Sequence, residues 1–238
     1  KRQAPRYGMA LGFGNTASGS AVAIGHKTSA YGGSYALGSN TDASNSSIAI
    51  GIGTSTWDDS QKTKASGGSV AIGKNTQASD SAYAVGSYAY ANGGSYAFGS
   101  SAHAENNSYA IGDSAYARSN SLAIGDSAKS DVSDGIALGN NSTVYRGATA
   151  GLDPRNGQLS ENTTPTWKST YGAFSIGAVD SDGNVTGTRQ IIGVAAGTND
   201  TDAVNVAQLK QVAQGFSIHD YSVNSTTCLL YTSPSPRD

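Results

Sequence analysis

The sequence has few of the bulky apolar residues that ordinary globular cores need. Leu, Ile, Val and Phe account for only 37 of its 238 residues, whereas glycine alone contributes 31. In a strongly charged chain such a composition would favour disorder, because little apolar burial is available to offset the backbone entropy lost on folding. The formal net charge is only -2, however, and the apolar residues recur at regular intervals. The composition therefore indicates order built by repetition.

Cysteine, long apolar runs and clustered charge are also scarce. The single cysteine, Cys228, excludes an intrachain disulfide framework and a cysteine metal site. No apolar run approaches the ~18 residues of a transmembrane helix, and Lys1 to Met9 lacks the apolar stretch of a signal peptide. We therefore expect a soluble piece whose export signal and membrane anchor lie outside it. Scattered Lys and Arg form no basic stripe, which argues against a nucleic-acid partner.

Residues that carry catalysis are sparse as well. His26, His103 and His219 are scattered, and we find no nucleophile elbow, phosphate-binding loop or metal-ligand cluster. The acidic pair Asp58 and Asp59 is explained better by a solvated loop than by a metal site. We therefore expect no enzymatic activity, no metal and no cofactor.

A short phrase, Ser-x-Ala-(aliphatic)-Gly, recurs through the first 139 residues. Its closing glycines are 13 residues apart, except for one step of 14 and one of 22. The long step is one repeat plus a nine-residue insertion around Trp57, which we expect to form a loop. The closing glycines are Gly12, Gly25, Gly38, Gly51, Gly73, Gly86, Gly99, Gly112, Gly125 and Gly139.

Each repeat has the alternation of β-strands. With the closing glycine as position 0, bulky apolar residues occupy positions -3 and -1, and alanine occupies -2 in every copy. This period of two predicts one strand. A small residue at +3 and, in most copies, alanine at +5 predict a second, flatter strand. Ten rungs stacked about 4.7 to 4.9 Å apart predict an all-β solenoid roughly 45 Å long.

The alternation also predicts which side chains point inward. We expect the bulky residues at -3 and -1 to line the core, including Tyr35, Tyr83, Tyr96 and Tyr109 at -3. This core is thin, so we expect several rods to pack side by side and complete its burial.

Position +4 lies between two small residues and is expected to point outward. A column of such residues suits the binding of an extended protein, although it could simply cover the wall. On successive rungs the position is occupied by Gln77, Tyr90, His103, Tyr116 and Lys129. Of these we single out Tyr90, His103 and Tyr116 as candidate ligand-binding residues.

Other solenoid classes fit the repeat less well. Calcium-binding solenoids need runs of aspartate that are absent here. Hexapeptide acyltransferases repeat every six residues, and thirteen is not a multiple of six. Ice-binding solenoids need a flat array of outward threonines, whereas only Thr28, Thr41 and Thr76 fall in register here.

The repeat fades beyond residue 147, which divides the chain. We expect repeats over 1–147, an irregular connector over 148–188 with a strand-like stretch at Phe174 to Ile176, and a neck with the start of a coiled coil over 189–215. Residues 216–238 are unassigned. We interpret residues 227–238, which place Pro234 and Pro236 where a helix should continue, as a translated adapter or cloning scar.

The neck contains a helix signal. Asp200 or Thr201 can cap a helix that begins near Asp202. Val206, Leu209 and Ala213 then follow at the spacings of a narrow coiled-coil stripe. So short a helix is marginal alone, which predicts bundling with copies of itself.

The repeats are followed by the neck phrase Ile-Ile-Gly-Val-Ala-Ala-Gly-Thr-Asn-Asp-Thr-Asp-Ala-Val-Asn-Val-Ala-Gln-Leu-Lys. Together, over about residues 7–214, they resemble the head and neck of a YadA-like trimeric autotransporter adhesin. The resemblance implies a left-handed parallel β-roll in each chain of a homotrimer. It implies that Val204, Val206, Leu209 and Ala213 contribute to a trimeric neck and coiled-coil stalk.

The resemblance further implies a location and a role. It places the chain on the outer-membrane surface of a Gram-negative bacterium, held by an anchor outside this sequence. It implies adhesion to host matrix proteins such as collagen or fibronectin, or to other cells. The leading hypothesis is thus a multivalent adhesin head. The alternative is a structural spacer that presents another binding domain.

Overall fold

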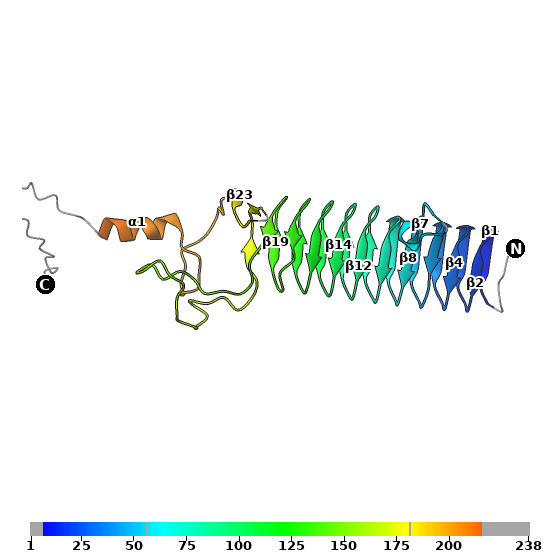
Figure 1. The fold of residues 1–238 in the computed structure, drawn as a ribbon, viewed down its shortest axis with the longest axis horizontal. Helices are drawn as coiled ribbons and strands as arrows, with labels where there is room; N and C mark the ends of the chain where they lie inside the picture. Colours follow the sequence, from blue (N-terminus) through cyan, green and yellow to red (C-terminus); the bar gives the residue numbers. More distant parts are fainter. Residues whose placement is uncertain (1–6, 56, 181, 216–238) are drawn as a thin grey trace, which may run out of the picture. The chain divides into compact units, whose positions relative to one another are not determined.

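The computed structural model describes residues 7–55, 57–180 and 182–215. It divides into two compact units at Gln190. The first holds a stack of β-rungs and an irregular connector, and the second holds the neck with one helix (Figure 1). The residues that we interpret as a scar, 227–238, lie outside the described residues.

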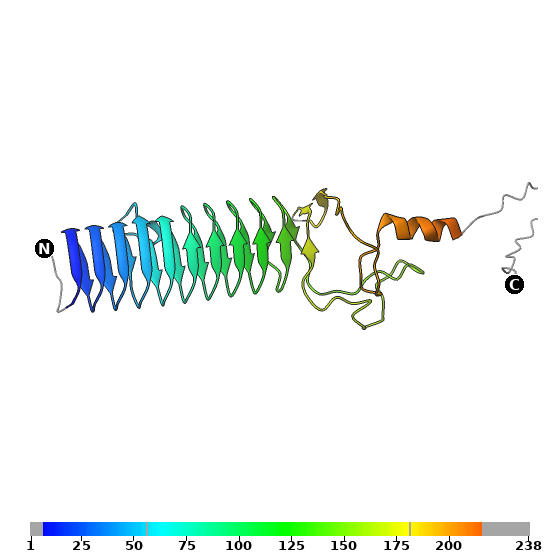
Figure 2. The ribbon, with the colours of Figure 1, turned by 180° about the vertical axis from the view of Figure 1, so that it is seen from behind.

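Two parallel sheets form the walls of the stack, and each rung gives one strand to each wall (Figure 2). We call the 11-stranded wall sheet I and the 10-stranded wall sheet II. Sheet I contains β1 (Met9–Phe13), β3 (Val22–His26), β5 (Tyr35–Ser39), β7 (Ile48–Ile52), β9 (Val70–Lys74), β11 (Tyr83–Val85), β13 (Tyr96–Phe98), β15 (Tyr109–Ile111), β17 (Leu122–Ile124), β19 (Ile136–Leu138) and β21 (Phe174–Ser175). Sheet II contains β2 (Thr16–Ser18), β4 (Ser29–Tyr31), β6 (Thr41–Ala43), β8 (Thr63–Ser66), β10 (Gln77–Ser79), β12 (Tyr90–Asn92), β14 (His103–Glu105), β16 (Tyr116–Arg118), β18 (Lys129–Ser130) and β20 (Thr143–Val144).

The remaining elements lie outside these walls. A 3-10 helix, η1 (Asp59–Gln61), forms in the insertion. The connector contributes a small antiparallel pair, β22 (Ala178–Val179) and β23 (Val185–Gly187). The neck ends in α1 (Val206–Gly215).

Equivalent positions of successive repeats pair with each other, so each position forms a column. Ala84 pairs with Ala97, and Ala97 pairs with Ala110. The insertion leaves the register intact, because Ile50 pairs with Ile72 across it. The predicted all-β solenoid is thus confirmed, and the backbone groups of each rung bond to its neighbours.

Small side chains fill the solenoid core, and the prediction that bulky residues line it is wrong. The position -2 alanines of β3 to β19 are 0% exposed. Tyr35, Tyr83 and Tyr109 instead lie on the outer face of sheet I and are 50%, 38% and 45% exposed, with Tyr96 partly exposed beside them. A period of two identifies two opposite faces without saying which is inward. Short turns hold the two walls so close that only small residues fit between them.

Buried serines join successive rungs inside this core. Ser95 Oγ accepts a hydrogen bond from the Ser108 backbone N–H, and Ser108 Oγ accepts one from the Ser121 N–H, both at 3.1 Å. Ser34 Oγ accepts from Ser47 N–H at the same distance. These hydroxyls satisfy N–H groups that are shut away from water, so the core tolerates a polar residue in nearly every rung.

The closing glycines bring neighbouring rungs into close contact. Gly99 has a φ of 140°. A Cβ atom there would lie 2.2 Å from the carbonyl oxygen of Gly112 in the next rung. Both the backbone conformation and the available space therefore require glycine.

Arg189 closes the far end of the stack. Its guanidinium donates hydrogen bonds to the Asn140 carbonyl oxygen at 2.7 Å, to Ser142 Oγ at 3.0 Å and to the Ile176 carbonyl oxygen. These donors satisfy acceptors at the edge where the repeat stops. The predicted strand-like stretch near Phe174 is also found, as β21 paired with β19.

The helix begins four residues later than predicted. Gln208 N–H donates to Asn205 Oδ1 at 3.0 Å, and Asn205 N–H donates to Gln208 Oε1 at 3.2 Å. This reciprocal capping box starts α1 at Val206, so Asp200 and Thr201 do not cap it. The Asp202 carboxylate instead accepts the N–H groups of Asn199 and Thr198, which lower its pKa.

We predict that Gly99→Ala destabilises the solenoid far more than Gly157→Ala. Gly157 also has a positive φ, of 69°, but a Cβ there meets nothing within 4 Å. Gly157→Ala, the control, should therefore lower the free energy of unfolding by only about 1–2 kcal/mol, the cost of placing alanine in the left-handed region. Gly99→Ala adds to this cost a collision with the backbone of the next rung. Urea unfolding followed by circular dichroism measures both. Equal losses would contradict the close approach of the rungs.

We predict that Asn205→Ala frays the start of α1. Loss of the cap costs about 1 kcal/mol, so the Gln208 amide should exchange its hydrogen about fivefold faster. Gln211→Ala, an exposed change in the same helix, is the control and should leave that rate unchanged. Unaltered exchange in the Asn205 variant would show that the capping box does not hold the helix start.

Candidate functional site

A column of polar and aromatic side chains runs along the outer face of sheet II. It comes from position +4 of β10, β12, β14, β16 and β18, whose alanine or serine neighbours at +5 point into the core. The strand pairing places these side chains one above another, as the sequence predicts. We call this column the +4 ladder, and it consists of Gln77, Tyr90, His103, Tyr116 and Lys129.

The rings of the ladder stack on one another. Tyr90 and His103 have ring centroids 4.7 Å apart, and His103 and Tyr116 have centroids 5.0 Å apart. Lys129 Nζ lies 5.8 Å from the Tyr116 ring centroid, a cation–π contact at the end of the stack. Because the ring faces contact each other, the ladder presents ring edges, tyrosine hydroxyls and an ammonium group to solvent.

A second column, at position +6, flanks the ladder with charges that sequence reasoning missed. His103 Nε2 lies 3.1 Å from Glu105 Oε1, and Arg118 Nε lies 2.9 Å from Asp131 Oδ1. Arg118 Nη1 also donates to the Tyr116 hydroxyl at 3.2 Å. Position +6 follows the same period of two as +4, so the repeat itself contained the signal that these residues share a face.

The electrostatic environment of the ladder is mixed. Burial, followed by the negative charges of Glu105 and Asp80, raises the pKa of Tyr90. The Asp131 carboxylate is the main cause of the raised pKa of Arg118. The raised pKa keeps Tyr90 a neutral hydrogen-bonding group, and charges of both signs lie beside the ladder.

The outer face of sheet I has the opposite character. Two columns of large apolar side chains, from positions -3 and -1, run along it, and we call them the apolar strip. Tyr83, Tyr96 and Tyr109 stack within the strip with centroids 5.0 and 4.9 Å apart. Phe98 and Ile111 are each 39% exposed. A continuous apolar surface of this length is typical of a face that another molecule covers.

The neck also exposes apolar side chains. Val204, Val206 and Leu209 are 69%, 66% and 62% exposed, and Ala213 is exposed as well. Val206, Leu209 and Ala213 lie on α1, whereas Val204 precedes it. The predicted stripe is therefore present on the helix, open to a partner.

Two kinds of site are absent from the described part of the chain. Among residues 7–55, 57–180 and 182–215 there is no group of three His, Cys, Asp or Glu side chains that could hold a metal ion. In the same ranges no helix has the length and apolarity to span a bilayer.

These features define a repeat protein whose surfaces, rather than an enclosed cavity, carry its chemistry. Residues 190–226 match the family model for the coiled stalk of trimeric autotransporter adhesins. The chain is 50% identical over 80 residues to autotransporter adhesin BadA of Bartonella henselae, and 45% identical over 75 residues to autotransporter adhesin EhaG of Escherichia coli O157:H7. The alignments cover 33% and 32% of this chain, but only 2% of BadA and 4% of EhaG.

A solved structure is similar as well. The crystal structure of the collagen-binding domain of Yersinia adhesin YadA aligns with 84% of this chain and 83% of that chain, at 26% identity and a TM-score of 0.46. The resemblance predicted from the repeats and the neck is confirmed: the chain is similar to trimeric autotransporter adhesins. Both of these relatives are named as adhesins.

Proposed function

We propose that this chain is a head-and-neck segment of a homotrimeric adhesin on the outer-membrane surface of a Gram-negative bacterium. The +4 ladder is its binding surface for host matrix proteins. The observation that carries the proposal is the pair of opposite solenoid faces, one apolar and one polar with stacked aromatic rings. The similarity to autotransporter adhesins supports the role.

The apolar strip supports the association of three copies. Side chains such as Phe98 and Ile111 are too exposed in one chain to contribute their full burial energy, about 25 cal/mol for each Å² of apolar surface removed from water. The strip follows the whole length of sheet I, and α1 presents a second apolar stripe. Packing copies together through the apolar strip would leave sheet II facing outward.

The ladder supports contact with an extended protein such as collagen or fibronectin. Its hydroxyls and ring edges repeat at the spacing of the rungs, and each can bond to the backbone or side chains of a partner that lies along the rod. Single contacts of this kind are weak. Three ladders in one trimer would add through effective concentration.

A spacer role is the second candidate, because the +6 column already partners much of the ladder. His103 lies against Glu105, and Arg118 engages both Tyr116 and Asp131. Groups that are paired within the chain have less to offer a ligand. In this reading sheet II is a solvated wall, and another domain carries the binding.

We predict that Phe98→Asp prevents the chain from associating. In light scattering the unaltered chain should have three times its 24.0 kDa mass, and the variant should have the mass of one chain, because it buries a carboxylate in the strip. Asn120→Asp, in an exposed turn that Asp tolerates at its φ of 61°, is the control and should remain trimeric. A folded monomer of the unaltered chain would contradict trimerisation.

We predict that replacing Tyr90, His103 and Tyr116 together with Ser weakens binding to immobilised collagen or fibronectin at least tenfold. The loss reflects about 1.4 kcal/mol or more of ladder contacts. Tyr31→Ser with Tyr145→Ser removes exposed tyrosines at position +6 of rungs outside the ladder and should leave binding unchanged. Both proteins must remain trimeric. Full binding by the triple variant would overturn the ladder as the site, and absence of binding by the unaltered chain would favour the spacer.

A further inference from the structure

The one insertion in the repeat is a well-anchored loop between β7 and β8. Thr54 N–H donates to Asn75 Oδ1 at 2.9 Å, and Asn75 Nδ2 donates to Gln61 Oε1 at 3.2 Å. Asn75 is 3% exposed and belongs to the next rung, so it fixes the base of the loop to the solenoid. Near the tip, Asp58 Oδ1 accepts the Ser60 N–H at 2.9 Å. Hydrogen bonds therefore hold the base of the loop and the turn at Asp58.

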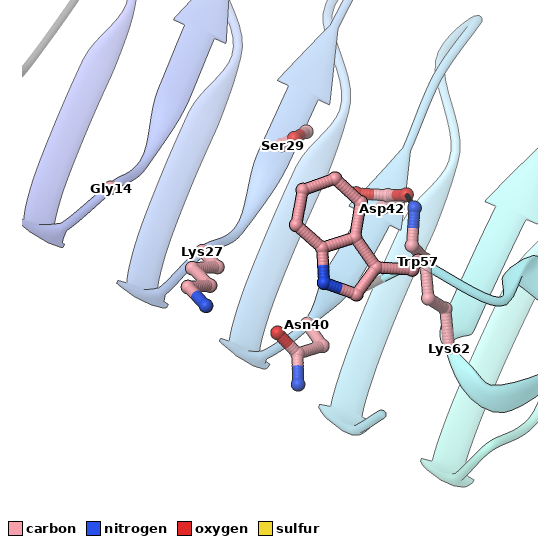
Figure 3. A pocket seen from close by; sticks show the side chains of 7 residues that line it. All are labelled: Gly14, Lys27, Ser29, Asn40, Asp42, Trp57 and Lys62. Atoms are coloured by element: carbon pink, nitrogen blue, oxygen red, sulfur yellow. Dashed lines mark hydrogen bonds and ion pairs between the residues drawn. The ribbon is translucent and has the colours of Figure 1, made fainter. Parts of the chain in front are cut away.

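This loop presents Trp57 to solvent. The side chain is 94% exposed, the highest exposure among the large apolar residues of the described chain. It overhangs a hollow of about 260 Å³ on the first rungs (Figure 3). The hollow is lined by Gly14, Lys27, Ser29, Asn40, Asp42, Trp57 and Lys62. An indole in this place contributes little to the fold, which points to a role in contact with another molecule.

Polar groups surround the indole in a fixed arrangement. Lys62 Nζ lies 3.0 Å from Asp42 Oδ2, which holds that carboxylate at one wall. Asn40 Nδ2 donates to the Gly53 carbonyl oxygen at 2.9 Å, and this bond sets the orientation of its amide. Asn40 Oδ1 is then shut off from water with no hydrogen-bond partner among the described residues. An acceptor left unpaired in this way costs about 1–3 kcal/mol, which an incoming donor would relieve.

The side of the hollow opposite the Lys62–Asp42 pair carries a positive charge, that of Lys27. In Figure 3 the Lys27 ammonium lies on the opposite side of the Trp57 indole from the Lys62–Asp42 pair, and Asn40 lies below the indole. Lys27 forms no ion pair with the part of the chain that the structure describes. The hollow thus combines a flat apolar surface, hydrogen-bond acceptors and one available positive charge.

We propose that this hollow, the Trp57 hollow, binds a pyranose ring that carries a carboxylate, as in an acidic sugar of a host glycan. The C–H face of the ring would stack on the indole, and a hydroxyl would bond to Asn40 Oδ1 once a small local rearrangement exposes that oxygen. The carboxylate would pair with Lys27, and Asp42 would accept a second hydroxyl. At about 260 Å³ the hollow suits a single ring rather than a drug-sized ligand.

Other ligand classes fit less well. A quaternary ammonium group needs several aromatic walls, and Trp57 is the only aromatic residue that lines the hollow. An apolar ligand would leave the lysines, Asn40 and Asp42 without compensation for lost water. The proposal stands apart from the +4 ladder, because the two surfaces have no residue in common.

Trp57 itself can report binding. The chain has two tryptophans, so Trp167→Phe leaves Trp57 as the only indole emitter. We predict that N-acetylneuraminic acid or glucuronic acid produces a saturable change in the emission of this variant of the full chain. Galactose should bind at least tenfold more weakly, because it lacks the carboxylate. Acetate, which lacks the ring, should produce no saturable change.

Variants of the unaltered chain then test each contact by ligand-observed NMR. Trp57→Ala should abolish binding of the acidic sugars. Lys27→Gln should weaken it at least fivefold while leaving the weak binding of galactose as it was. The triple Ser variant of the ladder should retain sugar binding in full, which separates this site from the proposed function.

Three results would overturn the proposal. The first is the absence of any emission change with either acidic sugar. The second is an equal response to acetate, which would reduce the site to a surface anion contact. The third is sugar binding that survives Trp57→Ala in a variant with an unchanged circular dichroism spectrum.

Discussion

The structure depends on the close parallel stacking of rungs that are too small to fold alone. Each rung encloses little more than alanine, serine and threonine, so the hydrophobic effect inside one chain is weak. Hydrogen bonds between rungs, both along the sheets and through buried serines such as Ser95 and Ser108, supply order instead. The stack also requires the closing glycines from Gly12 to Gly125, because a side chain at any of them would meet the backbone of the next rung. Stacking of the repeats in register is thus a condition for folding.

This constraint determines what the surfaces can do. A core filled by small residues forces every large side chain outward, and the register then turns each outward position into a column. Sheet I collects apolar columns and sheet II collects polar ones. In the proposed function, copies of the chain associate through sheet I and bind the ligand through sheet II. The residues of one sheet can therefore suit association without weakening ligand binding by the other. The pleat of each strand sends alternate residues outward, and the two walls of the rung place the apolar and polar columns on opposite sides.

Much of this arrangement could be predicted from the sequence, because repetition makes register visible. The spacing of the glycines predicts the rungs, and position +4 predicts the stacked rings of Tyr90, His103 and Tyr116. The direction of the core could not be predicted in the same way. Alternation defines two faces of each strand, and Tyr83 or Tyr109 would suit a core if the walls lay further apart. The separation of the walls depends on turn geometry, which composition does not show.

Irregular segments were harder to predict because their side chains can form several alternative sets of hydrogen bonds. Asn205, Gln208 and Asp202 all have side chains that can cap a helix, and sequence alone does not say which of them bonds to which N–H group. The Trp57 hollow is a similar case, since it joins an insertion to residues from three earlier turns of the stack. Lys27 and Asn40 are unremarkable within their repeats. They line the hollow only because the stacking of the rungs places them beneath the loop that begins after residue 52.

The position of the insertion has a physical explanation. A nine-residue excursion inside a strand would break the register that holds every later rung. Placed between β7 and β8, it lengthens a turn, and the paired Ile50 and Ile72 show that the next rung resumes its place. The cost of closing a longer loop grows slowly with length. A solenoid can therefore acquire a new side-chain constellation at any turn without altering its core, and the anchoring of Thr54 by Asn75 gives this one the rigidity that a binding site needs.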